Sequence, residues 1–293
     1  MRPAWLDRDE YPFAPHWLDV EGGRLHYVDE GRGDAIVMVH GTPTWSFLYR
    51  HLIKALCGAH RCVVPDLLGF GLSDKPRDAD YRPETQARRL TFLIERLALR
   101  DLTLVVHDFG GPIGLSYGLD HVENVRRLVI FNTWLWSFEG DRHMELVGKL
   151  FGTVVGRILD EWFNFSVRGF WRSAIRDRSR YTRAVHAHYL APLDTPAARR
   201  ATWIYARELL GSSAWYEHLW QRRDRLRSVP ALIVWGMKDP AFGRYLSRWR
   251  AEWPAAEVVA LPDVGHAPME ERPDAVLSVI ETFLLPAEPQ LGR

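Results

Sequence analysis

Asp108 stands where an apolar, β-branched run ends and two glycines begin, in the segment Leu102-Thr-Leu-Val-Val-His-Asp-Phe-Gly-Gly111. A buried strand, a tight turn that lifts one side chain and a helix N-terminus form the pattern of a nucleophile elbow. The elbow usually carries serine. A carboxylate at this point is suited to attack an electrophilic carbon and form an ester with the substrate. A helix-capping aspartate is the alternative, because Asp is a favoured N-cap residue.

Hydrolysis of such an ester needs a base and an acid that orients the base. His266 is the candidate base, with a structural histidine as the alternative, and Asp239 on the loop after residues 231–235 is the candidate acid. The order Asp108, Asp239, His266 matches the order of nucleophile, acid and base in elbow-containing hydrolases. Asn132 occupies the competing position for the acid and carries no carboxylate.

The same hydrolysis needs amide donors for the oxyanion that develops on the ester. The segment His40-Gly-Thr-Pro43 predicts an oxyanion loop, with the amides of Thr42 and Phe109 as donors. A second motif, Gly114-Leu-Ser-Tyr-Gly118, matches G-x-S-x-G in letters. Because it falls inside a predicted helix and follows no strand, Ser116 is not expected to be the nucleophile.

The elements that must position these side chains are apolar strand-like runs that alternate with helix-like stretches. A continuous apolar strand pattern of this kind predicts a mostly parallel sheet that helices cover on both faces. In such sheets the functional loops follow the carboxyl ends of the strands, so the candidate residues should converge on one edge. The expected strands are residues 24–30, 35–39, 61–65, 102–106, 127–131, 231–235 and 257–261.

The strand pattern disappears between residues 137 and 229, where a helical pattern rich in aromatic residues replaces it. We therefore predict a core domain formed by residues 1–136 and 230–293, and a helical cap domain over an apolar pocket at residues 137–229. Ordinary helix packing is the alternative role for most of these aromatic side chains.

The amino-acid composition limits which binding partners are expected. A formal net charge of +1 gives no reason to expect a nucleic acid or a membrane surface. Two cysteines and an N-terminus without a signal-peptide pattern favour a cytoplasmic protein, and no apolar run approaches the ~20 residues that span a bilayer. The residues imply no cofactor and no metal, and the expected partners are a small apolar organic substrate and water.

With these motifs in place, the chain resembles the α/β-hydrolase fold and, within it, the haloalkane dehalogenase family. The resemblance rests on segments 40–50, 66–76, 106–111, 236–239 and 265–266. It implies that Asp108 displaces a halide from carbon, and that His266 with Asp239 activates water against the resulting ester.

In that family two N–H donors hold the departing halide: an indole directly after the nucleophile, and an Asn in the oxyanion loop or a Trp in the cap. Phe109 and Thr42 stand at two of these positions here, and a phenyl ring has no N–H to donate. An indole could come from elsewhere in the chain, from Trp134, Trp136, Trp162 or Trp171. Of these, Trp134, Trp162 and Trp171 are predicted as substrate-binding residues.

Three alternatives to a haloalkane dehalogenase function stay open. A related epoxide hydrolase would use cap tyrosines to protonate the ring oxygen, and the candidates are Tyr181, Tyr189, Tyr205 and Tyr216. A β-lactone-processing relative would need no halide site of the usual kind. A non-catalytic ligand-binding relative is disfavoured by the intact set of candidate catalytic side chains.

Overall fold

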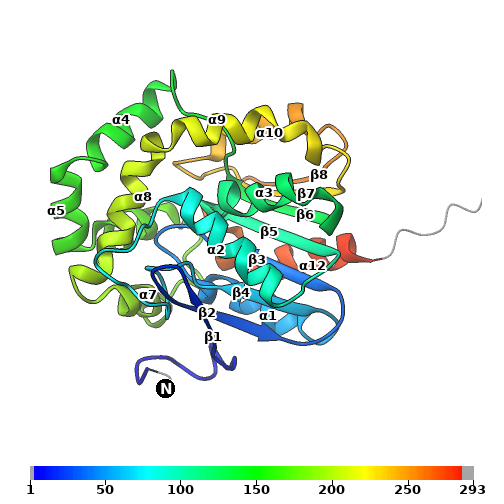
Figure 1. The fold of residues 1–293 in the computed structure, drawn as a ribbon, viewed down its shortest axis with the longest axis horizontal. Helices are drawn as coiled ribbons and strands as arrows, with labels where there is room; N and C mark the ends of the chain where they lie inside the picture. Colours follow the sequence, from blue (N-terminus) through cyan, green and yellow to red (C-terminus); the bar gives the residue numbers. More distant parts are fainter. Residues whose placement is uncertain (1–2, 286–293) are drawn as a thin grey trace, which may run out of the picture.

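The computed structural model describes residues 3–285. Within this range one eight-stranded sheet has the order β1-β2-β4-β3-β5-β6-β7-β8 (Figure 1). β2 pairs antiparallel with β1 and β4, and every other neighbouring pair is parallel. The predicted mostly parallel sheet is confirmed. The strands are β1 His16–Val20, β2 Gly23–Glu30, β3 Ala35–Val39, β4 Arg61–Pro65, β5 Leu102–Asp108, β6 Val125–Thr133, β7 Ala231–Gly236 and β8 Glu257–Leu261.

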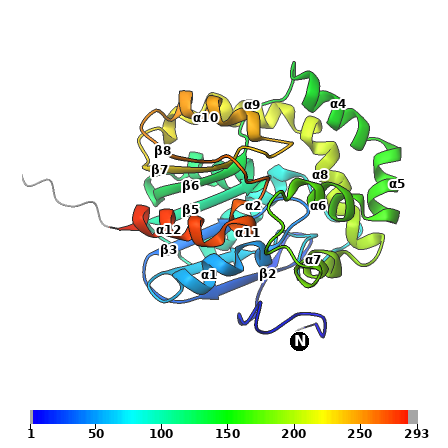
Figure 2. The same cartoon turned by 180° about the vertical axis from the view of Figure 1, so that it is seen from behind.

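Helices cover the sheet on both faces, α2 and α3 on one and α1 and α12 on the other (Figures 1 and 2). Each face has its own cluster of buried apolar side chains, because the strand residues alternate between the two sides. The helices of the core are α1 Arg50–Leu56, α2 Pro83–Arg96, α3 Gly110–Asp120, α10 Leu246–Glu252, α11 Pro268–Glu271 and α12 Pro273–Leu284.

The expected strands are all present, and β1 is an additional one. β1 is an edge strand whose residues are half-buried or exposed in alternation, so it lacks the continuous apolar pattern of the inner strands. A tight turn at Gly22 and Gly23, both with positive φ, folds β1 back onto β2. The turn is visible in the sequence, but the short amphipathic strand before it is not distinctive.

Residues 137–229, which we call the helical insertion, contain helices and loops but no strand. The insertion sits at one end of the sheet, beyond β5, with α4 and α5 outermost (Figure 1). The boundaries proposed for a separate cap domain stay a prediction. Its helices are α4 Arg142–Phe151, α5 Val154–Phe163, the π-helix Ser166–Trp171, α6 Arg172–Ala174, α7 Arg183–Leu190, α8 Arg200–Gly211 and α9 Ser213–Gln221.

The outer face of α4 and α5 is apolar and exposed. Leu146, Val154 and Trp162 are each exposed by about two thirds of their surface. Despite these apolar stretches, none of the helices in residues 3–285 has the length and apolar character to cross a bilayer.

Candidate active site

Asp108 is the last residue of β5 and has a positive φ of 51°, a conformation that few residues other than glycine adopt. The Thr133 hydroxyl donates a hydrogen bond to the Asp108 carbonyl and fixes the turn from the neighbouring strand β6. The turn is crowded, since a Cβ built on Gly111 would come within 1.8 Å of Thr133 Oγ1. The sequence therefore folds into a strained turn that holds the Asp108 side chain up at the carboxyl edge of the sheet.

The loop after β3 supplies an amide to this carboxylate. The Thr42 N–H donates to Asp108 Oδ1 at 2.8 Å. Gly41 permits the close approach, because a Cβ built on it would come within 2.1 Å of the same oxygen and 2.6 Å of the Phe109 amide nitrogen. Of the two amides predicted as oxyanion donors, that of Thr42 thus hydrogen-bonds to Asp108 Oδ1, and that of Phe109 lies close to Gly41 in the same loop contact.

His266 and Asp239 form a buried pair on the loops after β8 and β7. Asp239 Oδ2 accepts from His266 Nδ1 at 2.8 Å and from Asn132 Nδ2 at 2.9 Å, and Oδ1 accepts from the Ala241 amide. Burial alone raises the pKa of Asp239, but the His266 ring and the hydrogen bonds outweigh burial and hold it below its usual value. Asn132, at the position considered for the acid, orients Asp239.

The other ring nitrogen of His266 faces the elbow. Nε2 lies 3.6 Å from Asp108 Oδ2 and makes no hydrogen bond within the described residues. Burial opposes a charge on the ring, but Asp239 and Asp108 together overcome it and raise the pKa of His266 to about 10. With both carboxylates ionised, the imidazole therefore keeps its proton.

Two further side chains, which sequence reasoning did not single out, hold His266 in place. His107, next to Asp108, points its Nε2 at the His266 carbonyl at 2.8 Å. Burial and the neighbouring His266 charge lower the pKa of His107 to about 3, so its ring is neutral and Nε2 carries the donating proton. The sequence did contain one signal for His107, since it is a histidine directly before the elbow in an apolar strand.

Glu271 is the second of these side chains, and it is fully buried. It accepts backbone N–H groups on both sides of His266, from Gly265 and Ala267. It also accepts the amides of Arg176 and Asp177 in the helical insertion. This carboxylate therefore ties the histidine loop to the insertion. Its place in a short helix just after His266 gave no hint of contacts with residues about 90 positions away in sequence.

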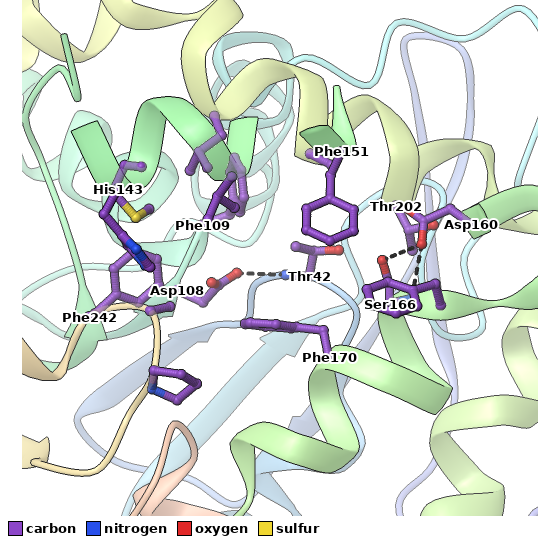
Figure 3. A pocket seen from close by; sticks show the side chains of 17 residues that line it. Thr42, Asp108, Phe109, His143, Phe151, Asp160, Ser166, Phe170, Thr202 and Phe242 are labelled. Carbon is purple, nitrogen blue, oxygen red and sulfur yellow. Dashed lines mark hydrogen bonds between the residues drawn. The ribbon is translucent and has the colours of Figure 1, made fainter. Parts of the chain in front are cut away.

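A cavity of about 260 Å³ opens above Asp108 between the core and the helical insertion (Figure 3). Most of its lining is apolar, including Phe109, Phe151, Phe170 and Phe242. Among the described residues that line it there is no lysine, arginine, tryptophan or tyrosine. The cavity therefore offers a reactive carboxylate at one end of a small apolar chamber.

Comparison with known proteins places the chain in a family. A family model of the alpha/beta hydrolase fold matches residues 34–273. The chain belongs to the α/β-hydrolase family. It is 35% identical to a cis-3-alkyl-4-alkyloxetan-2-one decarboxylase of Shewanella oneidensis, over 94% of this chain and 90% of that protein. It is also 35% identical to haloalkane dehalogenase 2 of Mycobacterium tuberculosis, over 94% of this chain and 97% of that protein.

Solved structures agree with this assignment. The crystal structure of haloalkane dehalogenase DatA from Agrobacterium tumefaciens C58 superposes with a TM-score of 0.83 at 25% identity, covering 92% of this chain and 96% of that one. The resemblance of this α/β-hydrolase to the haloalkane dehalogenases is thus confirmed at the level of sequence and of fold.

The three tryptophans predicted to bind substrate do not line the cavity of this α/β-hydrolase. Trp134 is fully buried one layer behind it, against Phe109 and Phe242. Trp171 is buried beside the His266 ring, and Trp162 points to solvent on the outer face of α5. Phenylalanines take their place along the chamber, and the packing of the insertion, which decides this, could not be derived from sequence.

The tyrosines considered as epoxide-opening acids are also absent from the lining. Tyr189 donates to Glu270, Tyr216 donates to the Glu208 carbonyl, and Tyr181 pairs with His186. Tyr205 is buried against the outer side of Phe109. No tyrosine of the described chain is therefore positioned to protonate a substrate in the chamber.

Ser116 lies on α3, outside the chamber. In the part of the chain that the structure describes, no three His, Cys, Asp or Glu side chains gather as they would around a metal ion. The side chains that meet at the reactive end of the chamber are those of acid–base and nucleophilic chemistry.

Proposed function

We propose that this α/β-hydrolase uses Asp108 to attack a saturated carbon of a small apolar substrate and then hydrolyses the resulting ester, as a haloalkane dehalogenase-like enzyme. One observation carries the proposal: Asp108 lines the apolar chamber, with its Oδ1 accepting the Thr42 amide and its Oδ2 3.6 Å from His266 Nε2. Oδ2 is thus the attacking oxygen, and Oδ1 is the oxygen that later carries the oxyanion.

In the first step Asp108 Oδ2 forms a bond to the substrate carbon while the bond from carbon to halogen breaks, and the halide takes the electron pair. Esterification removes the negative charge beside His266 Nε2, which lowers the pKa of the ring and lets it release its proton to solvent. The raised pKa of His266 in the free enzyme is therefore compatible with its role as a base in the second step.

In the second step His266 takes a proton from a water molecule as the water oxygen bonds to Asp108 Cγ. The amides of Thr42 and Phe109 stabilise the oxyanion on Oδ1. Collapse of this intermediate breaks the ester bond, and His266 returns its proton to the departing alcohol oxygen. The remaining acid proton passes to His266 Nε2, which restores both the Asp108 carboxylate and the protonated ring of the free enzyme.

Opening of a β-lactone is the second candidate reaction, and the chamber lining favours it. A free halide needs N–H donors, whereas no indole lines the chamber and the side chain of Phe109 has no N–H. In a β-lactone Asp108 would attack the saturated ring carbon that is bonded to the ring oxygen. The carboxylate that leaves this carbon stays attached to the rest of the substrate. Loss of CO₂ with return of the electron pair to Asp108 then gives an alkene, and attack of water gives a hydroxy acid.

Intact mass spectrometry of His266→Ala tests both reactions, since this variant can form the ester but cannot hydrolyse it. A bromoalkane should add the mass of its alkyl group to Asp108, when the adduct is mapped by peptide digestion. A β-lactone that is opened and then hydrolysed should add its whole mass, whereas one that loses CO₂ should leave no adduct and release an alkene even from His266→Ala. Asp108→Asn is the matched control and should give neither an adduct nor an alkene. The proposal fails if wild-type protein turns over a bromoalkane while His266→Ala carries no adduct or carries one at another residue, or if Asp108→Asn still releases alkene from the lactone.

A further inference from the structure

A second carboxyl group lines the chamber, at the opposite side from Asp108. Asp160 belongs to α5 in the helical insertion and is only 3% exposed. Figure 3 shows Asp160, Ser166 and Thr202 together at that side, with Phe151, Phe170 and Thr42 between them and Asp108. The chamber therefore has a carboxyl group at each end and a mostly apolar middle.

Only one oxygen of Asp160 has partners. Oδ1 accepts the Ser166 amide at 2.9 Å and the Ser166 hydroxyl at 2.7 Å. Within residues 3–285 no hydrogen bond or ion pair reaches Oδ2. The nearby arginines are engaged elsewhere, Arg157 with the Glu161 carboxylate and Arg199 with backbone carbonyls. A carboxyl oxygen at the wall of an apolar chamber is poorly solvated when the protein supplies no donor to it.

A purely structural role does not account for this arrangement. The two hydrogen bonds from Ser166 tie α5 to the start of the π-helix, and an Asn oxygen could accept both. Burial raises the pKa of the Asp160 carboxyl even though the Ser166 hydrogen bonds oppose the shift. The cost of burying an acid at a chamber wall is offset when a ligand supplies the missing donor.

We infer that Asp160 Oδ2 binds a hydroxyl or amino group at the far end of the substrate, so that the enzyme acts on bifunctional molecules with a reactive carbon at one end of an apolar chain and a hydrogen-bond donor at the other. The inference rests on the proposed function for the reactive end only. The chamber lining of apolar side chains between the two carboxyls fits the carbon chain.

Binding to the inactive Asp108→Asn protein tests the subsite without turnover. A series of α,ω-alkanediols of increasing length is compared with 1-alkanols and ω-methoxyalkanols of matching length, by calorimetric titration. One diol length should bind about tenfold more tightly than its alkanol and its methoxy analogue, as expected for a hydrogen bond to a carboxylate. Equal binding of the three at every length would overturn the inference, and this comparison needs no change at Asp160.

Asp160→Asn in the same background then identifies the group responsible. The preference for the diol over its methoxy analogue should disappear, because the Asn NH₂ group can donate to a hydroxyl and to an ether oxygen alike. Ser166→Ala, which leaves Oδ2 in place, should keep that preference. If both variants lose only thermal stability and bind diol and alkanol as before, Asp160 is a structural tie and the inference is wrong. Amino alcohols distinguish a cationic donor from a neutral one, since an ammonium group should bind more tightly than a hydroxyl and lose more in Asp160→Asn.

The last experiment compares turnover of plain bromoalkanes and of bromoalkanes that carry a terminal hydroxyl. It uses the wild-type enzyme and the single variant Asp160→Asn. Asp160→Asn should raise KM for the hydroxylated bromoalkane relative to KM for the plain bromoalkane. If neither bromoalkane reacts but the diol preference holds, the subsite stands and the proposed halide chemistry fails. If both react equally well before and after the substitution, the chemistry stands and the subsite fails.

Discussion

The edge of the core sheet and the helical insertion contribute to the same chamber in different ways. Every side chain at the reactive end is fixed by hydrogen bonds from a neighbouring element, as Asp239 is by Asn132 and the His266 loop is by Glu271. On the outer helices of the insertion, apolar side chains such as Leu146 and Trp162 face solvent. The core therefore holds the candidate catalytic side chains by hydrogen bonds, and the insertion contributes part of the chamber wall beside the core residues Phe109 and Phe242.

The largest expected effect comes from the core. Asp108→Asn removes the attacking carboxylate but keeps its shape and tolerates the positive φ at this position. Turnover, measured as initial product release, should fall by about 10⁴-fold or more. Ser116→Ala, outside the chamber, should retain wild-type turnover. Activity above a tenth of wild type in Asp108→Asn, with the Asn verified by mass, would exclude Asp108 as nucleophile.

Glu271 links the two regions, so its removal should affect both. Glu271→Ala leaves backbone amides on both sides of His266 without an acceptor, and we expect a loss of about 3 kcal/mol in the free energy of unfolding. Displacement of His266 should lower kcat by about 10²-fold. Glu271→Gln retains one acceptor oxygen and should lose less of both. Urea unfolding and single-turnover rates measure the two effects, and equal losses in both variants would contradict this role.

The difference between the core sheet and the helical insertion also explains which features could be predicted from the sequence. The strands, the turn at Asp108 and the order of Asp239 and His266 follow from local patterns: apolar runs, glycines and chain order. The tryptophans of the insertion could not be placed, because helix packing decides whether Trp162 faces the chamber or solvent. Glu271 and Asp160 were missed for the same reason, since their roles depend on contacts made by tertiary folding.

Phe109→Trp tests whether the leaving group is a free halide. An indole at this chamber-lining position adds an N–H donor, and release of bromide from bromoalkanes should rise about tenfold. Phe109 packs against Trp134 and Tyr205, so the larger ring should cost about 1–3 kcal/mol of stability. Phe242→Trp places an indole on another part of the wall as control. An unchanged or lower bromide release would favour a reaction without a free halide.

The pH dependence of stability reports the charge balance at the core. The pKa of His266 rises from 6.5 to about 10 on folding, because Asp239 and Asp108 favour the protonated ring. A raised folded-state pKa stabilises the protein fully below pH 6.5, and this contribution is lost as the pH rises toward about 10. Urea unfolding of wild type relative to His266→Gln should therefore show a declining difference over this range. A stability difference that grows with pH would mean that folding lowers the pKa of His266 instead of raising it.

The smallest effect is expected on the outer face of the insertion. Trp162 is 66% exposed and contributes nothing to the chamber wall, so Trp162→Ser should leave kcat/KM within about twofold and stability within about 0.5 kcal/mol. Phe170 is the matched aromatic residue on the inner side, with its ring 6.0 Å from the His266 ring. Phe170→Ser should raise KM about tenfold, because it removes apolar contact area from the chamber.

A large effect of Trp162→Ser on KM would mean that the insertion brings α5 to the substrate in another arrangement during turnover. The division between a chemical core and a substrate-selecting insertion would then have to include a movement of α4 and α5. Equal, small effects of both substitutions would instead place substrate selection with Thr42, Phe109 and the other core residues of the wall. Parallel kcat and KM measurements on the two variants, with thermal melting as the folding control, separate these cases.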